Sequence, residues 1–176
     1  MLLRKINAGV SLLTTVLLIG HAGVQAVRML SRGSIQIPAG VVSWALFGLM
    51  IVHALISIDL AISGHTDGGN HRHKSYPKMN IPTMVQRVSG VLLILFSILH
   101  VAGTAGPLKP PPAVHAILPP LFFTVALIHA AVSVSKAFIT LGIGNAKTVK
   151  IVDIVVKVLC LAMLIADVTG FYLYLV

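Results

Sequence analysis

Five long apolar segments, separated by short polar or proline-rich breaks, constrain the fold of this chain more than any other feature. Each segment is close to the roughly 20 residues that a helix needs to cross the hydrocarbon core of a bilayer. Charged residues make up only 10% of the chain, whereas soluble domains carry about 25%. We therefore expect an all-α integral membrane bundle of five transmembrane helices, forming a single domain over residues 1–176. The expected helices run over about residues 8–30, 40–63, 84–105, 114–138 and 151–176.

The distribution of lysine and arginine predicts the orientation of this bundle. Arg28, Arg32 and Lys109 fall on one side of the expected helices, and the other ten of the 13 basic residues fall on the opposite side. Because basic residues collect on the cytoplasmic side, the N-terminus is expected in the cytoplasm and the C-terminus outside. This topology indicates a multi-pass protein of the cell inner (cytoplasmic) membrane. The net charge of +9 then reflects topology and lipid headgroups, and no nucleic-acid partner is expected.

Each of the first four apolar segments carries one histidine inside it: His21, His53, His100 and His129. An ionisable side chain within a membrane span is costly and marks a candidate functional site. At 1.5 Å per residue, His21 and His100 lie roughly 20 and 24 Å from the cytoplasmic ends of their helices. His53 and His129 lie roughly 20 and 22 Å from the outer ends of theirs. The four histidines are therefore expected to form an outer pair, His21 with His100, and an inner pair, His53 with His129.

Two opposed imidazoles in an apolar sleeve are what a bis-histidine haem requires, so the four histidines are predicted to be the iron ligands of two b haems. Two other interpretations remain open. An intramembrane histidine can simply hydrogen-bond a neighbouring helix, which contributes about 1 kcal/mol. Neutral imidazole also binds zinc or copper, but a metal transporter usually adds carboxylates or thiolates. Asp59 follows His53 by six residues, and Asp167 is the only acid expected near the outer pair.

Two basic residues are spaced to accompany the histidines. Arg28 follows His21 by seven residues, and Lys136 follows His129 by seven. Seven residues make about two helical turns, so each cation lies on the face of its histidine, toward the membrane surface. Arg28 and Lys136 are therefore candidate cofactor-binding residues that would pair with haem propionates. Ordinary interfacial anchors that extend their charges to the surface would show the same spacing.

The third segment begins with a more specific string, Gln86-Arg87-Val88-Ser89-Gly90, and His100 follows ten residues after the glycine. Two further features accompany this string: His53-Ala54 in the second segment, and Asn80 shortly before the Gln-Arg pair. With these features the chain resembles the cytochrome b membrane-anchor subunits of succinate dehydrogenases and fumarate reductases. It is most similar to the class in which one five-helix anchor holds two b haems.

This resemblance implies a site and a function. In that family the ligands come from the first four helices and pair first with third and second with fourth. Arg87, Ser89 and Gly90 are then part of the cofactor-binding motif. The chain would not be catalytic alone. It would anchor a flavoprotein subunit and an iron–sulfur subunit on the cytoplasmic face and pass electrons between the iron–sulfur subunit and membrane quinone. The alternatives are a dihaem quinone-reactive anchor of another respiratory oxidoreductase, or a haem-free membrane anchor or metal transporter.

Quinone chemistry moves protons together with electrons, so an acid must lie near the quinone oxygens. The chain contains no glutamate, and Asp167 lies about 16 residues into the last expected helix, at the depth of the outer haem. Asp167 is therefore predicted to be the catalytic proton-transfer acid, with a hydrogen bond between helices as the alternative. Asp59 and Asp153 lie near the inner surface, where a quinone site could use either one. The histidines of the second loop (His65, His71 and His73) suggest contact with a partner subunit or a metal.

Overall fold

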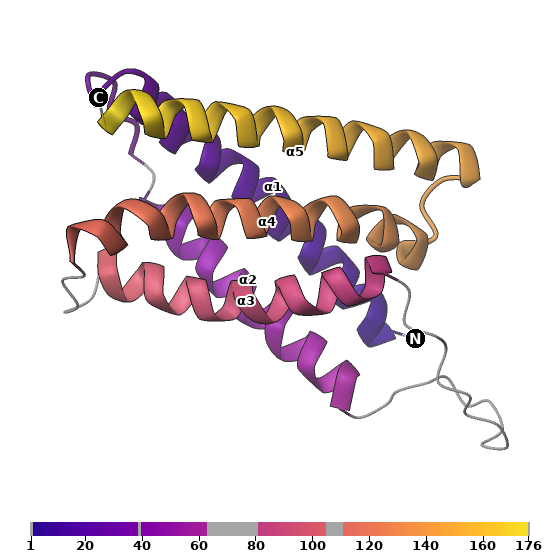
Figure 1. The fold of residues 1–176 in the computed structure, drawn as a ribbon. Coiled ribbons are helices and arrows are strands. Elements are labelled where there is room, and N and C mark those ends of the chain that lie inside the picture. The colour runs from indigo at the N-terminus through magenta and orange to yellow at the C-terminus, as the bar shows by residue number, and fades with distance from the viewer. Residues whose placement is uncertain (1, 39, 63–80, 105–110, 176) are drawn as a thin grey trace, which may run out of the picture.

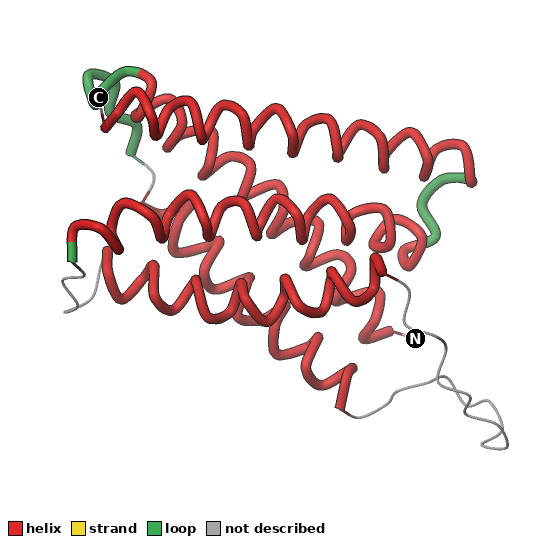
Figure 2. The backbone as a smooth tube through the Cα atoms, viewed as in Figure 1, coloured by secondary structure: helices red, strands yellow, loops and turns green. Residues whose placement is uncertain are grey.

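Residues 2–38, 40–62, 81–104 and 111–175 are described by the structure, a computed structural model. These residues form five α-helices joined by short connections (Figures 1 and 2). The helices are α1 Leu2–Leu30, α2 Gly40–Ile62, α3 Ile81–Thr104, α4 Pro112–Leu141 and α5 Ala146–Leu175. The predicted all-α class and the number of helices are confirmed.

Three of the helices extend beyond the predicted spans at the end of the bundle that carries most of the basic residues. α1 begins at Leu2 rather than near residue 8, α4 ends at Leu141 rather than at 138, and α5 begins at Ala146 rather than at 151. The predicted limits were placed where lysine and arginine interrupt the apolar runs. Both residues are good helix formers, and their long side chains reach water from an apolar helix end, so the helices continue past them.

A tight turn makes α4 and α5 antiparallel neighbours. Gly142 takes a left-handed conformation with φ 73°, which is accessible to glycine because it has no Cβ. Its N–H donates to the carbonyl of Ile139 at 3.1 Å, closing the last turn of α4. Three residues later the side chain of Asn145 starts the next helix: its Oδ1 accepts a hydrogen bond from the Thr148 N–H at 3.0 Å. Local sequence alone therefore reverses the chain at this point.

Helices α1 to α4 form a ring in which each packs against the next and α4 packs back against α1. α5 lies outside this ring, against α1 and α4 (Figure 1). Within the described part of the chain, α1 makes no backbone contact with α3, and α2 makes none with α4. These two pairs are therefore diagonal across the ring. The contact between α2 and α3 is the least extensive, and Figure 1 shows the C-terminal end of α2 leaning away from the other helices.

Polar side chains link the antiparallel neighbours and set their relative heights. In apolar surroundings each such bond is worth about 0.6 to 1 kcal/mol, so they fix register more than they add stability. The bonds are Asn7 Nδ2 to Ser57 Oγ at 3.1 Å between α1 and α2, Lys136 Nζ to Gln86 Oε1 at 2.7 Å between α4 and α3, and Ser135 Oγ to Asp153 Oδ1 at 2.6 Å between α4 and α5.

Small side chains let α4 and α5 approach closely. The buried cluster at their contact consists of Leu127, Ala130 and Cys160, with Phe123 and Met163 packed beside it. Small residues at helix contacts are typical of membrane bundles, where dispersion rather than the hydrophobic effect holds helices together. Cys160 serves as a packing residue in this contact.

The outer surface of the bundle is apolar. Val41, Val91, Ile117 and Leu161 are each more than half exposed, and they represent many similar positions along all the helices. Four helices have the length and mean hydropathy to cross a bilayer, over residues 2–28, 40–62, 81–103 and 117–141. α5 is not one of these four. An apolar surface of this extent matches a lipid environment rather than water.

Candidate functional site

The four intramembrane histidines lie on the four helices of the ring, one on each. His21 of α1 and His100 of α3 are on one diagonal, and His53 of α2 and His129 of α4 are on the other. All four side chains are half-buried. The predicted outer and inner pairs therefore coincide with the two pairs of helices that do not touch. A group held between two diagonal histidines would occupy the interior of the ring.

The inner pair is brought together directly. The ring centres of His53 and His129 are 6.4 Å apart, and the ring planes meet at 71°. A metal–imidazole nitrogen bond is about 2 Å long and the ring centre lies about 1 Å behind that nitrogen, so two imidazoles on one metal have centres about 6 Å apart. The observed separation therefore fits one metal ion between the two rings. The angle between the planes is compatible with this, since each imidazole can rotate about its metal–nitrogen bond.

His129 is held by two consecutive residues of α3. Ser89 Oγ lies 2.9 Å from His129 Nδ1, and Ser89 is buried. At the next position, a Cβ on Gly90 would lie 3.3 Å from His129 Cε1, which is tighter than an ordinary carbon–carbon contact. The glycine thus lets the imidazole lie against the α3 backbone. The Ser-Gly part of the predicted motif therefore surrounds the histidine of α4, on the inner pair.

His53 has different surroundings. Its Nδ1 is buried, and no hydrogen-bond partner for this atom lies among the described residues. The backbone of Asn7 in α1 lies beside the His53 imidazole, and the bond from Asn7 to Ser57 keeps the N-terminal part of α1 against α2 at this height. Ser57 follows His53 by four residues and so shares its face of α2. The inner pair is therefore enclosed by three other side chains or backbones from α1 and α3.

The outer pair has other contacts. His21 Nδ1 and Ser43 Oγ of α2 are hydrogen-bonded at 3.1 Å. The ring of His100 lies on that of Phe122 in α4, with centres 5.4 Å apart and planes tilted by 37°. The two histidines are therefore set in a polar contact and an aromatic contact, respectively. They are on diagonal helices, but the structure does not give them the close ring pairing of the inner pair.

The candidate cofactor-binding cations differ in their contacts. Lys136 is half-buried, and its Nζ donates to Gln86 Oε1 at 2.7 Å and to Thr83 Oγ1 at 3.3 Å. An ammonium has three N–H donors, so one further acceptor can be bound on the side of His129. Arg28 and Arg87 are exposed. The Gln86 side chain thus orients Lys136, so the two ends of the predicted motif serve α4 at two successive levels.

Asp167 is buried in α5, with 8% of its surface exposed, and its Oδ2 has no hydrogen-bond partner among the described residues. It follows Cys160 by seven residues and therefore shares the face of α5 that packs on α4. Since Ser135 is bonded to Asp153 and the helices are antiparallel, Asp167, 14 residues later, is level with residue 121, 14 residues earlier. The adjacent Phe122 contacts His100. Asp167 therefore lies at the level of the outer histidine His100.

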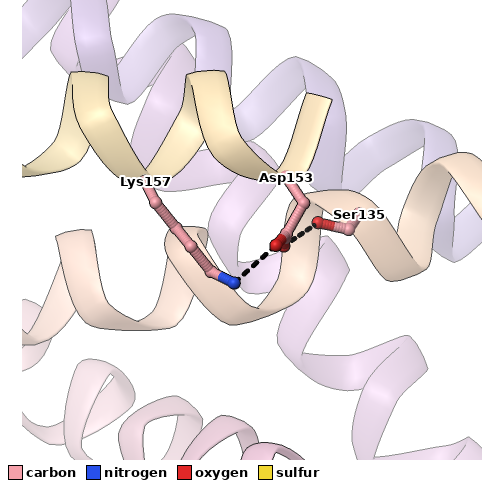
Figure 3. A network of polar contacts seen from close by, with 3 residues as sticks. All are labelled: Ser135, Asp153 and Lys157. Atoms are coloured by element: carbon pink, nitrogen blue, oxygen red, sulfur yellow. Dashed lines mark hydrogen bonds and ion pairs between the residues drawn. The ribbon is translucent and has the colours of Figure 1, made fainter. Parts of the chain in front are cut away.

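Asp153 lies at the other end of α5, in a polar network (Figure 3). It accepts hydrogen bonds from Ser135 at 2.6 Å and from Lys157 at 2.5 Å. Asp153 and Ser135 also line an open cavity of about 550 Å³ at the α4–α5 turn, together with Phe138 and Lys150. Unlike Asp167, this carboxylate is partnered on both oxygens. Asp59, the other acid expected near the inner surface, is exposed near the end of α2.

The histidines of the second loop, His65, His71 and His73, lie outside the described residues. In the part of the chain that is described, no group of three or more His, Cys, Asp or Glu side chains is placed to hold a metal ion. The two-histidine pairs are the candidate metal ligands within those limits.

Two serine contacts were not predicted from the sequence. Ser43 was not singled out, and Ser89 was assigned to a motif without a partner. A simple signal exists for both. In antiparallel neighbours, residues equally far from the connecting turn lie level: His21 and Ser43 are both 11 residues from Arg32. Ser89 and His129 are likewise equidistant from the middle of the connection between α3 and α4. Level placement does not show which faces meet, because rotation about the helix axis is not visible in the count.

Comparison of the chain with protein-family models, with curated proteins and with solved structures finds no match.

Proposed function

We propose that this chain is an integral-membrane dihaem cytochrome b, the membrane anchor and electron-transfer subunit of a succinate:quinone oxidoreductase or quinol:fumarate reductase. The observation that carries the proposal is the inner histidine pair: two imidazoles from diagonal helices with centres 6.4 Å apart. A second pair of histidines on the other diagonal supports a second site of the same kind. The family resemblance of the motif, and the position of its Ser-Gly part around a proposed ligand, point to the same function.

The residues of the inner site suit a b haem. His53 and His129 would supply the two axial nitrogens, and Lys136 would bind a propionate with the N–H that Gln86 and Thr83 leave unused. A haem iron with two imidazole ligands supplies one-electron redox chemistry, whose potential depends on the ligands and on burial. The chain contributes the ligands, an apolar sleeve and the paired cation. For the outer site, His21 and His100 would be the ligands and Arg28 the propionate partner.

The orientation proposed from the basic residues gives five transmembrane helices, with the N-terminus in the cytoplasm and the C-terminus outside. α5 is included as a span because it lies alongside α1 and α4 over their lengths (Figure 1). Its outward residues Val158, Leu161 and Ile165 are apolar and exposed. Its charged residues Asp153 and Lys157 neutralise one another at 2.5 Å, which reduces the cost of their position near the membrane surface.

The proposed partners are a flavoprotein subunit and an iron–sulfur subunit on the cytoplasmic face. Purification of the native complex through a tag on this chain should recover both, in amounts equal to the tagged chain, because an anchor without them has no source of electrons. Mass spectrometry of the purified complex measures this. Recovery of nitrate reductase or hydrogenase subunits instead would assign the chain to another respiratory enzyme.

The pairing of the four ligands can be tested by single substitutions. His53→Ala and His129→Ala should remove the same haem, and His21→Ala and His100→Ala the other, because each haem loses one of its two axial bonds. Optical spectra of the reduced proteins should therefore fall into two classes of two variants. His115→Ala is a suitable control, since His115 is not a proposed ligand, and should keep both haems. Four unrelated spectra, or a shared loss in His21→Ala and His53→Ala, would refute the diagonal arrangement.

Asp167 is the proposed proton-transfer acid of the quinone site. Asp167→Asn keeps the size of the side chain but cannot exchange a proton, so quinone-linked turnover should fall by more than about tenfold, the lower range for losing one positioned acid or base. Both haem spectra should stay intact. The matched control is Asp153→Asn, which alters an acid that is already paired with Ser135 and Lys157. Normal turnover in Asp167→Asn with slow turnover in Asp153→Asn would move the quinone site to the cavity at the α4–α5 turn.

A further inference from the structure

We infer that Ser89 is a positioning residue that keeps the proton of His129 on Nδ1 and so makes Nε2 the nitrogen available to a metal. This inference rests on the proposed function, in which His129 is an axial ligand of the inner haem. It goes further than that proposal, because it assigns a protonation state and an orientation to the ligand. It also gives the serine of the Gln-Arg-Val-Ser-Gly string a specific task.

The proton assignment follows from the bonds that Ser89 makes. A serine hydroxyl has one hydrogen to donate and two lone pairs that accept. Ser89 Oγ lies 2.6 Å from the carbonyl oxygen of Val85, one turn earlier in α3. A carbonyl can only accept, so the hydroxyl hydrogen is directed to Val85. Toward His129 the same oxygen must then accept, and the hydrogen in that 2.9 Å bond belongs to Nδ1.

In a neutral imidazole with its proton on Nδ1, the lone pair is on Nε2. Nε2 is the ring nitrogen on the side away from the α3 serine. The second contact with α3, the close approach of His129 Cε1 to Gly90, restricts rotation of the ring. Ser89 and Gly90 together therefore determine both the nitrogen that is available and the direction in which the ring presents it. Such partners of a ligating histidine also raise its basicity.

The same pattern occurs once on each diagonal. His21 is bonded through Nδ1 to Ser43 of the adjacent helix α2, as His129 is to Ser89 of the adjacent helix α3. In both cases the serine comes from a neighbour in the ring, and the bond engages Nδ1. Ser43 therefore provides a matched control at the other proposed haem.

A merely structural role for Ser89 makes a different prediction. A hydrogen bond between membrane helices contributes about 1 kcal/mol to stability, and its loss would lower the melting temperature without changing the electronic properties of a ligand. A positioning role changes the haem itself. With no acceptor for Nδ1–H, His129 becomes a weaker donor to iron, so the reduced state is favoured and the midpoint potential rises.

The experiment compares Ser89→Ala, Ser89→Thr and Ser43→Ala in the full-length chain, purified with its native partners. The readouts are the midpoint potential of each haem in a redox titration and the rate of haem loss to an excess of apomyoglobin. In Ser89→Ala the inner haem should have a raised potential and be lost about 10 to 100 times faster, the usual effect of removing the partner of a ligating histidine. Ser89→Thr, which keeps the hydroxyl, should restore both values. Ser43→Ala should change the outer haem only.

Unchanged potential and haem loss in Ser89→Ala, in a protein where His129→Ala removes the inner haem, would overturn the positioning role and leave the proposed function intact. A wild-type protein that binds no haem would overturn both. Equal effects of Ser89→Ala and Ser43→Ala on both haems would also contradict the inference, because they would indicate a general loosening of the bundle.

Discussion

Burying four imidazoles among apolar helices imposes the condition on which the rest of this structure depends. Each ring has two nitrogens with hydrogen-bonding or metal-binding capacity, and an unpaired polar atom in an apolar interior is costly. The bundle meets half of this demand for His21 and His129 with serines from adjacent helices. The facing rings of His53 and His129 leave a gap suited to one metal ion. In the proposed function, that ion is the iron of the inner haem.

The ring of four helices explains how a short chain can offer two such sites. Successive helices are antiparallel and adjacent, so first and third, and second and fourth, are diagonal and do not touch. One histidine per helix therefore produces two pairs across the interior, and their places along the helices separate the pairs in depth. The fifth helix lies outside the ring against α1 and α4, and brings the buried Asp167 to the level of His100. The polar bonds near the basic end set the heights on which this arrangement relies.

Much of this organisation could be predicted from the sequence, because it depends on length and periodicity. The five apolar runs predicted the five helices, and counting along them placed the histidines on two diagonals. The contacts of each histidine could not be predicted, since they depend on the rotation of each helix about its axis. Thus Ser43 was missed, and Ser89 and Gly90 were expected near a cofactor without it being known that they hold His129. The partnered state of Asp153 and the unpartnered Oδ2 of Asp167 depend on neighbouring helices in the same way.

The central claim is that two haems are held by four histidines, and the haem content of the purified chain tests it most directly. A pyridine haemochrome assay, referred to protein measured by amino-acid analysis, should give two b-type haems per chain. Low-temperature magnetic circular dichroism of the same oxidised sample should show two low-spin irons with bis-imidazole ligation. A stoichiometry of zero or one haem per chain, or a spectrum showing another axial ligand, would contradict the account.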